Sequence, residues 1–430
     1  MKKIFKSIVV RILQWEARAV LAKYKPRIVG VTGSVGKTST KDAIFSVLST
    51  AYHTRKSQKS FNSDIGIPLT ILGLQNGWND PVTWLKNIIH GLFQVILTHP
   101  YPEWLVLEVG ADRPGDIQKV TTWLKPDVAV VTAFAKVPVH IEFFSGRDAI
   151  IREKRYLVEA LKHDGVLVAN GDDADVMKMK DHTKNVSVVY GTDGASDIVA
   201  SGYEIYYTEN KEIAGLTFKV QYEDNVIPVV LRGTLGVQHV YAALAAMAVG
   251  LSQKINLVNA AQALLNHETP NGRMKLLPGI KNTLLIDDTY NSSPVAATAA
   301  LKTLKDIKKR KHKIAVLGDM LELGKHSVEE HYELGKLAAT SADILVTIGI
   351  RARKIAEGAL DAGMKETTIF QCDDSHEAAA LVHDMVKEGD IVLLKGSQSI
   401  RVERVTKALL ADPLRAGDVL VRQDTAWEKR

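Results

Sequence analysis

The stretch RIVGVTGSVGKTSTKD, residues 27–42, decides the fold of the first half of the chain. It begins with an apolar run typical of a buried strand and continues into the glycine-rich turn 33–39. Such a turn lets backbone amides surround a phosphate, and the N-terminus of a following helix favours the negative charge. Lys37 could reach the β- and γ-phosphates, and the Thr38 hydroxyl could bind Mg²⁺. Although Val31 stands where the full eight-residue pattern has glycine, the sequence predicts a nucleotide site.

Further apolar runs follow the same pattern of buried strands separated by helical stretches, which is typical of parallel sheets covered on both faces. Two regions between the runs differ. Residues 186–231 alternate as in LTFKVQY (216–222) and predict antiparallel hairpins, and residues 236–265 predict alanine-rich helices. The predicted parallel strands are RIVGVT (27–32), WLVLEV (104–109), VAVVT (128–132), GVLVAN (165–170), LLIDD (284–288), KIAVLG (313–318), ILVTIG (344–349) and IVLLKG (391–396).

The turn signal Pro270-Asn271-Gly272 favours a domain boundary. We therefore expect an α/β protein with three parts. Residues 1–26 form a basic amphipathic arm, residues 27–271 a central domain with the phosphate loop on a parallel sheet, and residues 272–430 a Rossmann-like α/β domain.

Composition excludes several classes of protein. The 430 residues are 46% hydrophobic and 24% charged, without a repeat, which excludes a fibrous chain. The single cysteine, Cys372, excludes an intrachain disulfide framework and fits a reducing compartment, so we expect a cytoplasmic protein. The net charge of +6 resides in residues 1–27, which hold eight Lys/Arg and only Glu16 as an acid. The rest of the chain is almost neutral, so we expect no nucleic-acid partner.

The arm is predicted to be a helix that ends near Pro26. Charges interrupt every apolar stretch in it, so it is neither a signal peptide nor a bilayer span. We expect it to dock on an anionic membrane surface. Its apolar residues at helical spacing are Phe5, Ile8, Val9, Ile12, Leu13 and Val20.

A second amphipathic segment covers residues 82–97. The ordinary interpretation is a helix whose apolar stripe faces the core. The alternative is a contact with a membrane surface or a partner beside the arm. The stripe consists of Leu85, Ile88, Ile89, Leu92 and Ile96.

Polar residues follow several predicted strands, at the edge where α/β sheets bind ligands. Glu108 closes one strand and is placed to hold Mg²⁺, although a surface acid is an equal alternative. His140 and Lys154 would each be structural or solvated if taken alone. In the second domain, Asp288, Asp319, Lys395 and their neighbours share one sheet edge, which favours a ligand there.

Taken together and in this order, these pieces resemble the Mur ligases of peptidoglycan synthesis, most of all the MurF branch, which adds D-alanyl-D-alanine to UDP-N-acetylmuramoyl-tripeptide. The resemblance covers residues 27 to 410, and only about 30 residues precede the phosphate loop, so we expect the family's N-terminal UDP-binding domain to be lacking. The motifs that carry it are VTGSVGKTSTKD (31–42), FNSDIGIPLTIL (61–72), LEVGADRPGDI (107–117), VHIEFFSG (139–146), NGDD (170–173), GRM (272–274), IDDTYNSSP (286–294), VLGDMLELGKHS (316–327) and LLKGSQSIRVE (393–403).

The resemblance implies an ATP-dependent carboxylate–amine ligase that forms an acyl phosphate and uses two Mg²⁺ ions. It implies catalytic roles for Lys37, Glu108, His140 and Lys154, with Lys154 carried as a carbamate. Metal ligands would be Thr38, Glu108, His140 and Lys154. Residues around ATP would be Gly33, Ser34, Val35, Gly36, Lys37, Thr38, Ser39, Gln238, His239, Arg273, Asp288 and Asn291. Residues near UDP-muramoyl peptide and D-alanyl-D-alanine would be Asn62, Ser63, Asp319, Lys395 and Ser397.

Besides the lacking UDP-binding domain, the chain departs from the family pattern at two places. Gln238-His239 replaces the His-Asn pair that contacts adenine, and Ala242 replaces a further asparagine. Ala133 and Tyr156 replace an asparagine and an acid near the acceptor site. Two alternatives follow: a related amide ligase for another peptide or polymer, and a catalytically silent homologue that binds nucleotide or precursor.

Overall fold

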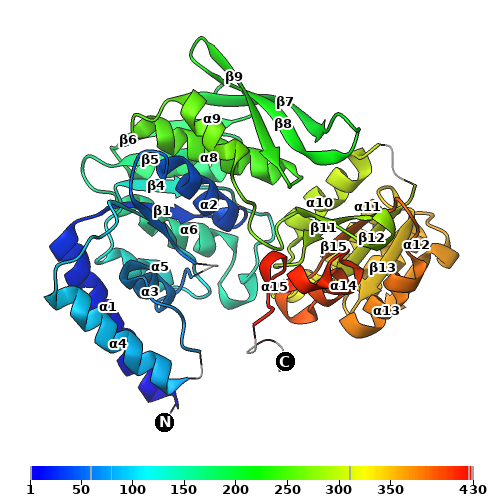
Figure 1. Cartoon of the computed structure of the whole chain (residues 1–430), viewed down its shortest axis with the longest axis horizontal. Coiled ribbons are helices and arrows are strands. Elements are labelled where there is room, and N and C mark those ends of the chain that lie inside the picture. The colour runs from blue at the N-terminus through cyan, green and yellow to red at the C-terminus, as the bar shows by residue number, and fades with distance from the viewer. Residues whose placement is uncertain (1, 59–60, 79, 309–310, 425–426, 428–430) are drawn as a thin grey trace.

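Strand β1 (Arg27–Thr32) lies inside a nine-stranded sheet, between the parallel neighbours β3 (Trp104–Glu108) and β4 (Val128–Val131). The computed structural model describes residues 2–58, 61–78, 80–308, 311–424 and 427. The strand order is β2-β3-β1-β4-β5-β6-β7-β8-β9 (Figure 1). Its central strands are buried on both faces, as their continuous apolar runs predict.

The parallel part of this sheet extends further than the sequence predicts. β6 pairs in parallel with β5 and with the start of β7, so the expectation of hairpins from residue 186 is wrong for β6. The hairpins begin at β7, and β7, β8 and β9 are antiparallel. The remaining strands are β2 (Thr54–Lys56), β5 (Val166–Asn170), β6 (Val186–Gly191), β7 (Ile198–Tyr207), β8 (Ile213–Tyr222) and β9 (Asn225–Arg232).

Helices cover both faces of the first sheet. One core includes α2 and the alanine-rich α8 packed on alternate residues of β1, and another includes α3, α5 and α6 on the opposite face. Small alanine side chains let α8 pack closely against α2. The close packing places the first turns of the two helices near one another. The helices are α2 (Lys37–Leu48), α3 (Gly66–Leu72), α5 (Asp116–Thr121), α6 (Arg147–Glu159), α7 (Ala174–Met177), α8 (Val237–Ser252) and α9 (Leu257–Leu265).

A second sheet of six strands, in the order β10-β11-β15-β12-β13-β14, follows from Lys275. Only the edge strand β10 is antiparallel, so the carboxyl ends of β11, β15 and β12 meet at one edge. The predicted α/β class is therefore confirmed. The strands are β10 (Lys275–Pro278), β11 (Leu284–Asp288), β12 (Lys313–Gly318), β13 (Ile344–Ile348), β14 (Ile369–Cys372) and β15 (Ile391–Lys395). The helices are α10 (Pro294–Asp306), α11 (Ser327–Ala339), α12 (Arg353–Asp361), α13 (Ser375–Met385), α14 (Glu403–Leu409) and α15 (Ala416–Val419).

The basic arm forms the predicted helix, α1 (Lys2–Tyr24), and packs on the body against α3 and α4 (Pro81–Ile96). Leu13 and Val20 of the predicted stripe are fully buried. Met1 and the side chains of residues 2–6, which include Phe5 of that stripe, lie outside the described part of the chain. No helix in the described ranges combines the length and the apolar character needed to cross a bilayer.

The apolar stripe of α4 points away from the protein, so its ordinary interpretation as a core-facing stripe is wrong. Leu85, Ile89 and Ile96 are 59%, 46% and 65% exposed. The buried side of α4 carries Asn87 and Gln94, which donate hydrogen bonds to main-chain oxygens of the 72–75 segment. These bonds orient the helix with its polar side inward.

Glu16 is the acid of the arm, and it is buried where α1 crosses α4. Its side chain is 1% exposed and Oε2 has no hydrogen-bond partner. A methyl group added at Gly91 would lie 2.1 Å from that oxygen, so the Glu16 carboxyl occupies the space that glycine leaves open. Burial raises the pKa of Glu16 to about 7.

We expect Glu16→Gln to stabilise the protein above pH 7. The folded protein keeps the proton on Glu16 up to about pH 7, whereas the unfolded chain releases it near 4.5. Folding therefore takes up a proton between these values, and the native protein loses stability as the pH rises through them. Glutamine abolishes this loss and should raise the free energy of unfolding by about 1–3 kcal/mol at pH 8. Urea unfolding at pH 5 and pH 8 measures the free energy of unfolding of the native protein and of Glu16→Gln. The same pH dependence of stability in the two proteins would contradict the raised pKa of Glu16.

Candidate active site

The loop after β1 has the backbone shape of a phosphate-binding turn. Gly33 and Gly36 have φ angles of 139° and 84°, which disfavour side chains. A Cβ atom on Gly33 would also lie 1.9 Å from Thr132 Oγ1, so the loop passes against β4 only because residue 33 is glycine. Thr132 Oγ1 donates to the carbonyl of Val35 at 2.7 Å and fixes the turn. The Ser34 hydroxyl is buried without a partner, as expected of a group that contacts a ligand.

Lys37 and Thr38 open α2 directly after this loop and lie beside Glu108 at the end of β3. Thr38 Oγ1 donates to one oxygen of Glu108 at 2.8 Å, and Asn62 Nδ2 donates to the other at 3.0 Å. Burial lowers the pKa of Lys37, and the charge of Glu108 opposes that shift. The structure thus brings together the phosphate lysine, a hydroxyl and a carboxylate, as the sequence predicts.

Lys154 of α6 shares a small cavity of about 30 Å³ with Lys37, Asn62 and His140. Its side chain is buried. Burial and, second, the nearby Lys37 lower the pKa of Lys154 to about 7. Two buried amines therefore meet here, and one of them is half neutral near physiological pH.

His140 connects the two sheet-bearing halves of the chain. Its backbone is left-handed, with φ 67°, and it precedes the short helix η1 (Ile141–Phe143). Nε2 lies 3.5 Å from Asp112, and Nδ1 lies 2.8 Å from Glu322 of the second half. The carboxylates that His140 contacts are thus Asp112 and Glu322, and not Glu108, which the resemblance names with His140 among the metal ligands.

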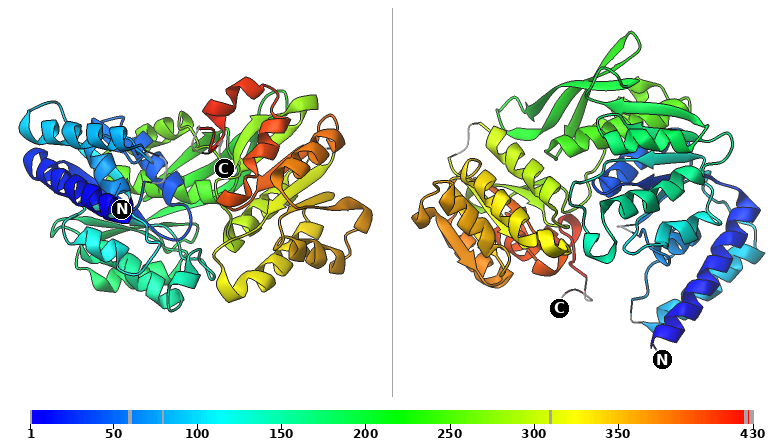
Figure 2. Two further views of the ribbon diagram at one scale, coloured as in Figure 1. Left: turned by 90° about the horizontal axis from the view of Figure 1, so that it is seen from below. Right: turned by 180° about the vertical axis from the view of Figure 1, so that it is seen from behind.

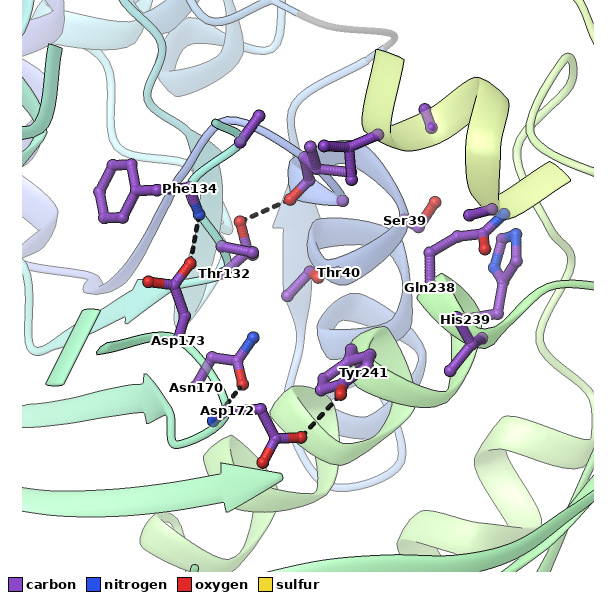
Figure 3. Close-up of a pocket in the computed structure, with 18 of the residues that line it drawn as sticks. Ser39, Thr40, Thr132, Phe134, Asn170, Asp172, Asp173, Gln238, His239 and Tyr241 are labelled. Atoms are coloured by element: carbon purple, nitrogen blue, oxygen red, sulfur yellow. Dashed lines mark hydrogen bonds between the residues drawn. The ribbon is translucent and has the colours of Figure 1, made fainter. Parts of the chain in front are cut away.

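A larger cavity of about 300 Å³ lies between α2, α8, the loop after β4 and the start of α10 (Figure 3). Its lining includes both glycine-loop residues and residues of the second sheet, so it opens between the two halves of the molecule. The predicted nucleotide residues that line it are Val35, Gly36, Ser39, Gln238, His239, Arg273 and Asp288.

Gln238 and His239, at the start of α8, have different roles. His239 is buried, and its Nε2 lies 2.9 Å from the carbonyl oxygen of Arg273. Burial lowers the pKa of His239 to about 3, so the ring is neutral and supports the chain at Arg273. Gln238 Oε1 has no hydrogen-bond partner. Of this pair, Gln238 therefore offers an acceptor in the cavity.

Arg273 and Asp288 reach the phosphate loop from the second half. Arg273 Nη2 donates to Thr38 Oγ1 at 3.4 Å. Asp288 Oδ2 lies 2.6 Å from Lys395 Nζ, and both side chains are buried. Lys395, expected near the dipeptide or the tripeptide tail, lies in the wall of the 300 Å³ cavity. The side chain of Asn291 accepts a hydrogen bond from the Ser292 amide and closes a turn. The main-chain carbonyl of Asn291 accepts a hydrogen bond from Lys395 Nζ.

The other predicted substrate residues hold loops. Asp319 Oδ1 accepts from the amide of Ala352 at 2.7 Å, and Ser397 Oγ accepts from the amide of Leu321 at 2.9 Å. The Ser397 amide in turn donates to the carbonyl of Asp319, which joins the ends of β12 and β15. Ser63 lines a separate cleft of about 650 Å³ that reaches Thr38 and Arg273 from the opposite side of α2.

The sequence assigns no role to several residues that line the 300 Å³ cavity. Asp172 accepts a hydrogen bond from Tyr241 at 2.6 Å, and Asp173 accepts one from the Phe134 amide at 2.6 Å (Figure 3). Asn170 accepts from the amide of Asp172. The signal was present in the segment NGDD (170–173), which follows β5 at the ligand-binding edge of the sheet.

Comparisons with known proteins agree with this arrangement. The profile of the Mur ligase middle domain matches residues 31–83 and 90–250, and that of the Mur ligase glutamate ligase domain matches residues 272–398. The UDP-N-acetylmuramoyl-tripeptide–D-alanyl-D-alanine ligase of Bacillus subtilis is 30% identical over 405 residues, which are 94% of this chain and 80% of the relative. The chain belongs to the Mur ligase family.

Other Mur ligases match over most of the chain. The ligase of the same name from Escherichia coli is 26% identical over 386 residues, covering 89% of this chain and 76% of the relative. The MurF ligase of Thermotoga maritima, solved in complex with ADP, has a TM-score of 0.75 and 28% identity and covers 93% of this chain and 83% of its own. A folylpolyglutamate synthase of Mycobacterium tuberculosis, 17% identical with a TM-score of 0.63, shares the fold. The predicted resemblance to the MurF branch is thereby confirmed.

Proposed function

We propose that this Mur ligase uses ATP to join D-alanyl-D-alanine to the tripeptide of a UDP-N-acetylmuramoyl acceptor. The observation that carries the proposal is the meeting of Lys37, Thr38, Glu108 and Lys154 at the carboxyl ends of β1 and β3. They adjoin a cavity of about 300 Å³, large enough for a nucleoside. The B. subtilis and E. coli relatives that carry this activity in their names align along nearly the whole chain.

The chemistry requires two anions to meet. The acceptor carboxylate attacks the γ-phosphorus of ATP, ADP leaves, and an acyl phosphate forms. The amine of D-alanyl-D-alanine then attacks the acyl carbon, a proton is lost, and phosphate leaves as the amide forms. Lys37 and Arg273, which approach Thr38 from the two halves, offset the negative charge during the first step. We propose that residues 27–271 and 272–430 are the domains that close and exclude water from the acyl phosphate.

The oxygen atoms of Thr38 and Glu108 fit Mg²⁺, which prefers hard oxygen ligands. Across the described residues, no three His, Cys, Asp or Glu side chains gather closely enough to hold a metal on their own. Two Mg²⁺ ions therefore need a further anion, and we propose that a carbamate on Lys154 supplies it, with His140 near the second ion. When bound, the ions would neutralise phosphate charge. The chain's own residues position the phosphates through the glycine loop and Lys37.

Lys154 suits carbamate formation for a physical reason. Only a neutral amine attacks CO₂, and burial brings the pKa of Lys154 down to about 7. The product carries a negative charge beside Lys37, so one repulsive contact between cations becomes attractive. A carbamate thus relieves the cost of burying two amines together.

Gln238 is proposed to recognise adenine in place of the family's asparagine. Its buried, unpartnered Oε1 can accept a hydrogen bond from the adenine amino group. Gln238→Leu should raise the KM for ATP about threefold to tenfold, the value of one hydrogen bond, with kcat little changed. Gln238→Asn serves as the conservative control and should retain part of the binding. An unchanged KM in Gln238→Leu, measured by phosphate release, would remove this role.

A phosphate-release screen over acceptors and amines tests the function. We expect release that depends on both UDP-N-acetylmuramoyl-tripeptide and D-alanyl-D-alanine. Turnover with a different carboxylic acid and none with this acceptor would favour the related amide ligase. ATP binding without turnover on any acceptor would favour the silent homologue. We propose Asn62, Ser63, Asp319 and Ser397 as residues that shape the acceptor and dipeptide sites.

We place this activity in the cytoplasm, where ATP and nucleotide-linked precursors are found. Cys372, the single cysteine, is a buried free thiol, which fits that compartment. Burial raises the pKa of its thiol to about 11, which keeps it protonated and weakly nucleophilic at neutral pH.

A further inference from the structure

One face of α4 exposes a continuous set of large apolar side chains, here called the outer face. Their positions follow the helical repeat, so they lie on the side opposite the buried Asn87 and Gln94. In Figures 1 and 2, α4 and α1 lie side by side at the edge of the molecule, far from the second sheet. The outer face consists of Val82, Leu85, Ile89, Leu92, Phe93 and Ile96, each between 42% and 65% exposed.

Specific hydrogen bonds keep the outer face of α4 turned toward solvent. Asn87 Nδ2 donates to the carbonyl of Gln75 at 2.8 Å, and Gln94 Nε2 donates to that of Leu72 at 2.5 Å. Asp80 caps the helix by accepting from the amides of Val82 and Thr83. Turning α4 by half a rotation would break these bonds and leave the carbonyl oxygens of Gln75 and Leu72 without these donors. The exposure of the outer face is therefore built into the packing.

Exposed basic residues accompany the outer face. Residues 1–27 carry eight Lys/Arg, and residues 81–97 carry no acid. Arg11 and Arg18 are exposed on α1, together with Trp15, which is 56% exposed. Glu16 of α1 is buried, and the exposed Asp80 at the start of α4 accepts hydrogen bonds from the amides of Val82 and Thr83. Apart from Asp80, the exposed side chains of this region are thus mainly apolar and basic. This favours an anionic lipid surface over a second copy of the same chain, whose positive charge would repel it.

We propose that the outer face of α4 inserts into the headgroup region of an anionic bilayer while Arg11 and Arg18 contact lipid phosphates. Helices that lie in the membrane interface have this combination of one apolar face, basic neighbours and an interfacial tryptophan. The arm expected to bind the membrane thus supplies mainly charge, because Val9, Leu13 and Val20 of its own apolar stripe are buried against the body. The proposal is independent of the ligase substrate.

The test uses the full chain and vesicles of phosphatidylcholine with or without phosphatidylglycerol. We expect the protein to sediment with the anionic vesicles and to dissociate as salt rises. A variant with Leu85→Ser, Ile89→Ser, Leu92→Ser and Phe93→Ser should bind at least tenfold more weakly. The matched control replaces four exposed apolar residues on other elements and should bind as the native protein does. These control changes are Val186→Ser, Val258→Ser, Val328→Ser and Leu414→Ser.

A charge variant separates the two parts of the proposal. Arg11→Gln and Arg18→Gln should weaken binding about fivefold for each charge removed, and the loss should shrink in high salt. Native protein that stays in solution with anionic vesicles at low salt would overturn the proposal. An equal loss of vesicle binding in the outer-face variant and in its matched control would also overturn the proposal. If the native protein forms a dimer that does not bind vesicles, and the outer-face variant is a monomer, the outer face is assigned to a second copy of the chain instead.

Discussion

Replacing Lys37 with alanine should lower kcat for phosphate release by about 10²–10³, the usual loss when one preorganised group at a developing charge is removed. Lys37 lies at the end of the glycine loop and shares a cavity with Lys154 and His140. Without its charge, the repulsion between the γ-phosphate and the acceptor carboxylate is offset less, because Arg273 and the proposed Mg²⁺ ions remain but Lys37 does not. Initial rates with saturating ATP, acceptor and D-alanyl-D-alanine measure the effect.

The Lys37 experiment has an internal check on folding. Burial lowers the pKa of Lys37, which means that the protein bears a cost for holding its charge. Lys37→Ala should therefore melt no lower than the native protein. Lys302→Ala, which removes an exposed lysine of α10, is the matched control and should keep full activity. A Lys37 variant within tenfold of native kcat would contradict the assignment.

Replacing Lys154 with alanine should cost at least 10² in kcat, because the site would lose the anion that we propose for it. A short carboxylate such as acetate can enter the space left by the side chain and replace that charge, so acetate should restore part of the activity. In the native protein, ¹³C-bicarbonate should give a carbamate carbon signal that Lys154→Ala lacks. The signal should strengthen as the pH rises through about 7, where the amine becomes neutral.

Glu153→Gln is the matched control for Lys154. Glu153 is the neighbouring buried residue, and it accepts from the amides of Gly115 and Ile117 to hold the start of α5. Its replacement should lower stability without making activity depend on acetate. Full activity in Lys154→Ala without acetate, or no carbamate signal in the native protein, would mean that Lys154 acts as an ordinary buried amine.

The parts of the site that are local in sequence could be predicted. The glycine loop lies between a strand and a helix that the pattern of residues 27–42 specifies by itself, and Thr38 meets Glu108 because β1 and β3 are parallel neighbours. The shared edge of β11, β12 and β15 also follows from parallel strands. In each case the geometry of the secondary structure fixes the position of the side chain.

The failures concern partners that are distant in sequence. The periodicity of α4 locates its apolar stripe but not what covers it, and the hydrogen bonds of Asn87 and Gln94 decided the orientation. β6 lies in the stretch expected to form hairpins, yet β5 pairs with it in parallel.

Isotope transfer tests the central claim most directly. The acceptor is prepared with ¹⁸O in both oxygens of the reacting carboxylate and incubated with ATP, Mg²⁺, D-alanyl-D-alanine and the native protein. An acyl phosphate passes one carboxylate oxygen to phosphate, so mass spectrometry should find one ¹⁸O in the released phosphate and one in the new amide. Phosphate without ¹⁸O, or a failure to form the amide with this acceptor, would contradict the account.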